Sequence, residues 1–154
     1  MNQKITQSIK QAMENQFNNI SIITKRGLRN KAENGWCPYS PPLGYLTDSG
    51  KNKCRKETVI DPKKFELIKK AFELIYLGKN TPLEAFDIVT SEWGLTNKNG
   101  ARISFRSWCG MLTNPFYYGE FEYPKDSGKW YKGKHNPMLT QAEFLKIQAF
   151  LNKK

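Results

Sequence analysis

The chain has 154 residues, 38% of them hydrophobic and 13% aromatic, so it is long enough and apolar enough to fold around a core, and disorder is excluded. Its 25 lysines and arginines outnumber 14 acidic residues and give a formal net charge of +11, which favours a polyanionic partner, nucleic acid above all. No apolar run approaches the ~20 residues of a membrane span and no signal core follows the N-terminus, so we expect a cytoplasmic protein with no membrane partner.

Few residues could bind a metal ion or act in catalysis. Cys37, Cys54 and Cys109 are widely spaced without a CxxC pair, and His135 is the single histidine. We therefore expect reduced thiols, no metal and no other cofactor. No acidic residues converge near His135, so a hydrolase is a poor alternative, and we expect no catalytic residue in this chain.

The first segment has the pattern of one long helix, from about Gln3 to Glu33, which Asn34-Gly35 ends. Hydrophobic residues recur along it at steps of three or four: Ile5, Ile9, Met13, Phe17, Ile20 and Ile23. This apolar stripe either pairs with another helix or packs against its own domain. The helix then becomes basic around Gly27, at Lys25, Arg26, Arg29 and Lys31. We expect these four side chains to contact phosphates, although a solvated helix face has the same pattern.

Residues 35–60 are rich in proline and glycine, which exclude a regular helix. Leu43–Leu46 and Glu57–Ile60 are expected to form short strands around a basic loop. From this loop we select Lys53, Arg55 and Lys56 as salt-sensitive phosphate contacts. Tyr45 fits a buried aromatic in a packed turn better than a base contact.

Three short helices with recognisable caps follow. Asp61-Pro62 predicts the start of the first, which Gly78 ends, and Thr81-x-x-Glu84 is a capping box for the second. Ser104 caps the third, Phe105 to Leu112, which ends before Asn114-Pro115. We expect these residues on the inward faces: Phe65, Ile68, Phe72, Ile75, Leu83, Phe86, Val89, Phe105, Trp108 and Leu112. The order predicts a helix-turn-helix-like bundle.

The start of the third helix is where we expect base recognition. Arg106 is the first choice as a base reader, because arginine binds guanine through two hydrogen bonds in the major groove. Arg102 and Lys98 suit phosphate, and Ser104 and Ser107 add hydroxyl groups near a helix N-terminus that favours anions. The alternative is a core helix whose arginines are merely solvated.

The remaining residues predict a hairpin and a last helix. The aromatic run Phe116–Tyr123 has the pattern of a strand, Pro124–Gly128 of a turn, and Trp130-Tyr131 of a second strand. Lys129 and Lys132 on this hairpin are further candidates for DNA contact. Interleaved aromatics and lysines could also stack on single-stranded bases, although strand aromatics more often pack on a core. A capping box at Thr140 starts the last helix, and the fold class is α+β.

The order of three motifs carries a family resemblance: Gly35-Trp36, then Pro42-Leu43-Gly44-Tyr45, then Leu112-Thr113-Asn114-Pro115-Phe116-Tyr117-Tyr118-Gly119. It resembles the recombinase domain of large serine recombinases. The resemblance implies a connecting helix at 1–34 and a DNA-binding recombinase domain at 35–154. It also implies recognition of a double-stranded attachment site for integration or excision of a phage or mobile element. Self-association as a dimer, and as a tetramer in the synaptic complex, follows from the same resemblance.

The resemblance also implies that the catalytic serine domain and the zinc-ribbon domain of a full-length site-specific recombinase lie outside these residues. We therefore expect no catalytic centre in this chain alone, and the full-length protein to be a serine site-specific DNA recombinase. Two other functions remain as alternatives. A helix-turn-helix transcriptional regulator would use the same three-helix order, and a nonspecific nucleic-acid-binding protein would use the same charge.

Overall fold

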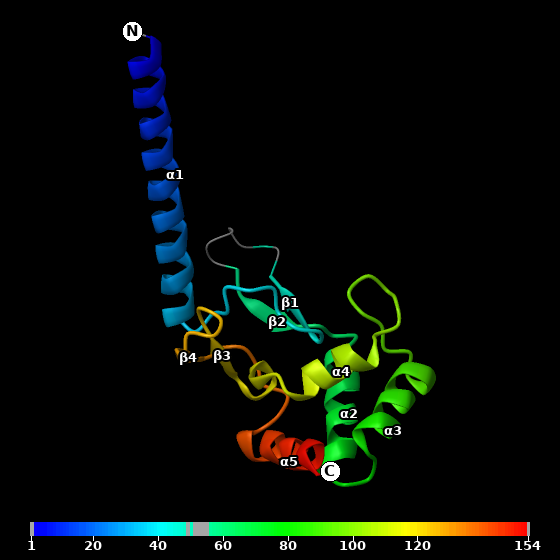
Figure 1. Ribbon diagram of the computed structural model, residues 1–154. Coiled ribbons are helices and arrows are strands. Elements are labelled where there is room, and N and C mark those ends of the chain that lie inside the picture. The colour runs from blue at the N-terminus through cyan, green and yellow to red at the C-terminus, as the bar shows by residue number, and fades with distance from the viewer. Residues whose placement is uncertain (1, 49, 51–55, 154) are drawn as a thin grey trace.

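The computed structural model describes residues 2–48, 50 and 56–153, and combines five α-helices with two small antiparallel hairpins in that part of the chain (Figure 1). This confirms the α+β expectation. The α-helices are α1 Asn2–Glu33, α2 Phe65–Tyr76, α3 Pro82–Asp87, α4 Phe105–Leu112 and α5 Gln141–Asn152. The strands are β1 Tyr45–Thr47, β2 Thr58–Ile60, β3 Glu120–Glu122 and β4 Trp130–Lys132. No helix among the described residues is both long enough and apolar enough to span a bilayer.

Helix α1 extends away from the rest of the molecule (Figure 1). The six residues of its apolar stripe are each between 53% and 68% exposed, so the alternative in which the stripe packs on its own domain is wrong. Only the end of the helix joins the core, where Ala32 is buried and Leu28 packs against it. Gly35, at φ 84°, closes the helix as predicted, and the amide of Trp36 donates to the carbonyl of Lys31 at 3.1 Å.

The core lies among α2, α3, α4 and α5. The ring of Phe72 lies between those of Trp108 and Tyr117, with centroids 5.8 and 5.1 Å away. Two inward residues were predicted wrongly. Leu83 is 55% exposed on the outer side of the short α3, and Phe105 is 42% exposed and makes an edge contact with the ring of Phe86. The other eight predicted inward residues are buried.

The helices begin at the predicted caps, except that one helix begins later than predicted. Thr81 and Thr140 form complete capping boxes, and the Ser104 side chain accepts from the amide of Ser107. The first helix of the bundle begins at Phe65 rather than at Pro62, because a turn precedes it. Asp61 still acts at that turn, where its side chain accepts from the amide of Lys63 at 2.9 Å.

The two hairpins were predicted, but the second begins later than expected. In β1–β2, Tyr45 pairs with Ile60, and in β3–β4, Phe121 pairs with Tyr131. The aromatic run before β3 is a 3₁₀ helix, Pro115–Tyr118, so the strand expectation is wrong there. The side chain of Asn114 caps this turn by accepting from the amide of Phe116, and the residues Phe116 and Tyr117 are buried.

Candidate nucleic-acid interface

The N-terminus of α4 presents an arginine that no described residue holds. Ser104 sits at the N-cap in extended conformation, and its hydroxyl lies 2.9 Å from that of Ser107. Both serines are exposed but are engaged in this cap. Arg106, in the same first turn, is exposed, and no described residue bonds its guanidinium. A free guanidinium therefore stands beside backbone amides that favour negative charge.

Arg102 is exposed too, but its guanidinium is held on the protein surface. It donates to Thr90 Oγ1 at 3.2 Å and lies over the ring of Phe86, 5.7 Å from the centroid. These contacts fix the side chain along the bundle. No local sequence pattern indicates these contacts, because Thr90 and Phe86 belong to the preceding helical segment.

The side chain of Lys98 is also held, by residues that are distant in the sequence. Its Nζ donates to the carbonyl of Pro41 at 2.6 Å and to Ser40 Oγ at 3.1 Å. The Nζ of Lys64 donates to the carbonyl of Asn97 at 2.7 Å. Two lysines therefore fix the loop before α4 to the segment after α1 and to the turn before α2.

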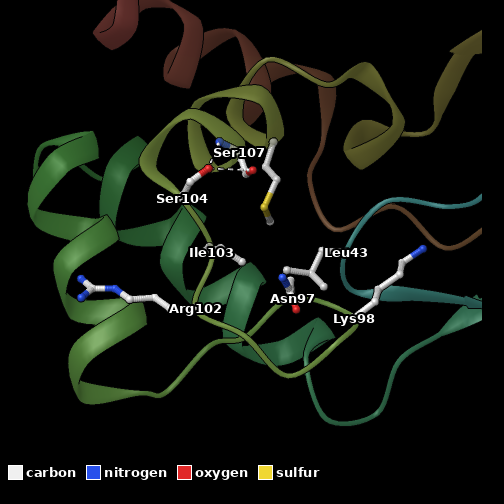
Figure 2. A pocket seen from close by; sticks show the side chains of 8 residues that line it. Leu43, Asn97, Lys98, Arg102, Ile103, Ser104 and Ser107 are labelled. Atoms are coloured by element: carbon white, nitrogen blue, oxygen red, sulfur yellow. Dashed lines mark hydrogen bonds between the residues drawn. The ribbon is translucent and has the colours of Figure 1, made fainter.

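A hollow of about 370 Å³ opens beside the start of α4 (Figure 2). It is lined by Leu43, Asn97, Lys98, Arg102, Ile103, Ser104, Ser107 and Met111. Four of the residues predicted to contact DNA thus meet at one place: Lys98, Arg102, Ser104 and Ser107. Asn97 was not among the predicted contacts. Its position in an Asn-Lys-Asn-Gly turn directly before the helix was the available signal.

The second basic group lies at the end of α1 and on the β3–β4 hairpin. Lys25, Arg26 and Arg29 are exposed and Lys31 is half-buried, while Lys129 and Lys132 are exposed on the hairpin. The amide of Lys134 donates to the carbonyl of Gly35 at 2.9 Å, which holds the end of α1 against the segment after β4. The end of α1 and the hairpin, about a hundred residues apart in sequence, therefore lie close together.

The remaining candidates are in the β1–β2 hairpin. Lys56 is half-buried beside β2. Lys53 and Arg55 lie outside the described residues. The structure therefore brings the predicted cations into two groups, and Lys56 belongs to neither.

Potential catalytic and metal-binding side chains are dispersed or enclosed. Among the described residues, no three of His, Cys, Asp or Glu are grouped to hold a metal ion. Cys37 and Cys109 are free thiols, and burial raises the pKa of Cys37. His135 is buried, which lowers its pKa, and its Nε2 lies 2.7 Å from the carbonyl oxygen of Phe116. It has the environment of a core histidine.

The aromatic residues of the hairpin region serve mainly the core. Phe121 and Tyr123 are buried, and Phe121 stacks with Tyr131 at 5.8 Å. Trp130 is the exception, being 52% exposed. Tyr45 is buried, as predicted, and its hydroxyl donates to the carbonyl of Asn136 at 2.6 Å. A row of exposed rings for stacking single-stranded bases is not formed by these described residues.

Comparison with known proteins identifies the family. The model of the recombinase family matches residues 62–154, more than half of the chain, so the chain belongs to the recombinase family. No curated protein sequence matches it. Among solved structures, one of an LSR–DNA complex, LSR standing for large serine recombinase, is similar in fold, with a TM-score of 0.61 at 14% identity. That match covers 86% of this chain and 38% of the other.

A second similar structure concerns the sequence requirements of the Listeria innocua prophage attP site. It has a TM-score of 0.59 at 15% identity, and the match covers 84% of this chain and 51% of that chain. This chain thus spans about half or less of the length of both structures. At these identities the likeness establishes the fold.

Proposed function

We propose that this chain is the DNA-binding recombinase domain of a site-specific serine recombinase and recognises a double-stranded attachment site. Family membership supports this, as do the two similar structures, one an LSR–DNA complex and the other concerned with an attP site. The single observation that carries the proposal is the exposed Arg106 at the start of α4, whose guanidinium no described residue binds. Such a side chain can bind a guanine edge in the major groove.

The remaining cations then hold the DNA backbone. Phosphate contacts supply affinity that falls with salt, whereas base contacts supply sequence preference. Exposed lysines and arginines suit the first role: Lys25, Arg26, Arg29, Lys129 and Lys132. The side chains of Arg102 and Lys98 donate hydrogen bonds to other residues of the protein. In this proposal their main role is therefore to shape the interface, and DNA contact is secondary.

The division of the chain follows from the same proposal. Residues 1–34 are the connecting helix, and 35–154 are the recombinase domain. The exposed stripe on α1 pairs with a second copy of the chain, as expected for a dimer that becomes a tetramer in synapsis. Strand cleavage and rejoining, in integration or excision of a phage or mobile element, belong to the full-length recombinase in the cytoplasm.

The test is fluorescence anisotropy of the 154-residue chain on labelled duplexes across a salt series. The specific duplex is selected from a random pool by repeated rounds of binding, and a scrambled duplex is the reference. We expect the selected duplex to bind at least ~10³-fold more tightly at physiological salt. Replacing Arg106 by alanine should remove ~1–3 kcal/mol of this preference.

Two matched variants separate charge from recognition. Arg106→Lys keeps the charge but loses the paired hydrogen bonds, so sequence preference should fall while the salt dependence stays. Lys146→Ala removes one charge from an exposed position of α5 that is outside both predicted basic groups, and should leave the preference unchanged. Equal binding of both duplexes, with only a steep salt dependence, would make the chain a nonspecific polyanion binder.

A further inference from the structure

The hollow beside α4 has an apolar floor under a polar rim. Ile103 and Met111 are at most 9% exposed, and the half-buried Leu43 closes a third side. The two cations of the lining point away from its centre, Arg102 to one side and Lys98 to the other (Figure 2). The hollow thus offers apolar surface inside and positive charge around it.

A hydrogen-bond donor of fixed position faces this apolar surface. The Oδ1 of Asn97 accepts from the amides of Asn99 and Ala101, at 2.9 and 3.0 Å, which fixes the oxygen in the turn. The amide nitrogen Nδ2 is therefore on the opposite side, directed toward the hollow (Figure 2). No described residue accepts a hydrogen bond from it. The side chain cannot turn over without breaking both bonds, so the site presents a fixed donor.

We infer that this hollow reads a thymine in the major groove, with Asn97 Nδ2 donating to O4 and Leu43, Ile103 and Met111 receiving the 5-methyl group. The inference rests on the proposed function and specifies its base recognition. Thymine alone shows an acceptor next to a methyl group on its major-groove edge. An apolar floor beside one fixed donor matches that pair.

The other bases fit less well. The amino group of cytosine is a donor and would face the donor of Asn97, while adenine offers the N7 acceptor beside a donor amino group and has no methyl group. Guanine has two acceptors and no methyl group, so the apolar floor of the hollow would face water or a polar base edge. Guanine instead suits the free guanidinium of Arg106 in the same stretch of chain. The two residues would then read neighbouring positions of one half-site.

The first experiment changes only the DNA. On the selected duplex, each thymine is replaced in turn by deoxyuridine, which removes the methyl group and keeps O4. One position in each half-site should weaken binding by about three- to fivefold, the effect of losing one buried methyl contact. Replacement by cytosine at that position should weaken binding by about tenfold or more, because two donors then meet.

The second experiment changes the donor. Asn97→Asp keeps the oxygen that holds the turn and replaces the amide donor by an acceptor. At the uracil-sensitive position, the preference for thymine over cytosine should fall at least tenfold and can invert, because a carboxylate accepts from the cytosine amino group. Asn99→Asp is the control, since it places the same charge in the same turn outside the hollow.

The outcomes separate the inference from the proposed function. Methyl sensitivity and the Asn97→Asp change at the same position support the inference. If no thymine is methyl-sensitive, or if Asn97→Asp weakens all duplexes by the same factor as Asn99→Asp, the hollow does not read thymine although site recognition stands. If selection yields no preferred duplex, the proposed function fails and the inference fails with it.

Discussion

The ring of His135 stacks on that of Phe116, with centroids 3.8 Å and planes 5° apart. A carbonyl oxygen only accepts, so its contact with Nε2 assigns the proton to that nitrogen. The edge of Tyr45 approaches from another side, with centroids 5.4 Å apart. Burial of the ring lowers its pKa below the ordinary 6.5. The folded protein therefore favours the neutral histidine.

This environment predicts a loss of stability on mild acidification. Below pH 6.5 the unfolded chain binds a proton that the folded chain resists, so stability should fall as the pH drops from about 7.5 to about 5.5. Urea denaturation at several pH values measures this. His135 is the single histidine, so His135→Phe should flatten the dependence in this window. An unchanged pH dependence in the variant would assign it to other groups.

Gly133 is predicted to be needed for space. A Cβ there would collide with the ring atoms Nδ1 and Cε1 of His135 and lie 3.3 Å from the carbonyl oxygen of Gly119. Gly133→Ala should therefore reduce the free energy of unfolding by ~1–3 kcal/mol, measured by urea denaturation. Gly27→Ala is the contrast, because a Cβ at Gly27 meets nothing within 4 Å. It should instead raise the helicity of α1 by circular dichroism.

At the scale of elements, α1 is the least supported part of the molecule. Its 32 residues span ~48 Å at 1.5 Å per residue, and its apolar stripe is exposed along most of that length. Most helical stability in proteins comes from packing of an apolar face, and this face has no partner among the described residues. A second copy of the helix would supply one.

Self-association through α1 is the corresponding prediction. Sedimentation equilibrium should show a monomer–dimer equilibrium, with helicity rising as the chain associates. Phe17→Asp places a charge in the stripe and should weaken association by at least tenfold. Asn18→Asp adds the same charge next to the stripe and should have little effect. Equal behaviour of the two variants would mean that the dimer uses another surface.

The elements were largely predictable because their boundaries are encoded locally. Ser104, Thr81 and Thr140 cap helices within three residues of themselves, and these starts were confirmed. The strand predicted at Phe116 and Tyr117 was wrong. It was predicted because aromatic residues favour strands in general. Here the side chain of Asn114 and Gly119 at φ 104° enclose a four-residue 3₁₀ turn, and the core accepts both rings in that conformation.

The candidate interface was predictable in residue type but not in geometry. Exposed arginines near a helix start can be recognised from the sequence, and Arg106 is exposed. The partners of Lys98 lie 58 and 57 residues away, and no local pattern reveals them. The same holds for the hollow, whose wall at Leu43 comes from a segment far from α4.

At the scale of the whole molecule, the fold extends beyond the residues that match the family. The match begins at residue 62, yet the core includes Tyr45, Cys37 and Ala32 from before it. Tyr117, which is buried inside the matched region, donates its hydroxyl proton to the carbonyl of Leu43 at 2.8 Å. Without the earlier segment, this hydroxyl would lose its partner and several aromatic rings would face water.

A truncation series tests this dependence. A fragment of residues 25–154 lacks most of the exposed helix but keeps Ala32, Cys37 and Tyr45, so it should unfold cooperatively and retain the near-ultraviolet circular dichroism of the whole chain. A fragment of residues 62–154 loses those core residues and should show little near-ultraviolet signal and no cooperative unfolding. Cooperative unfolding of the shorter fragment would instead mean that Ala32, Cys37 and Tyr45 pack on a core that is complete without them.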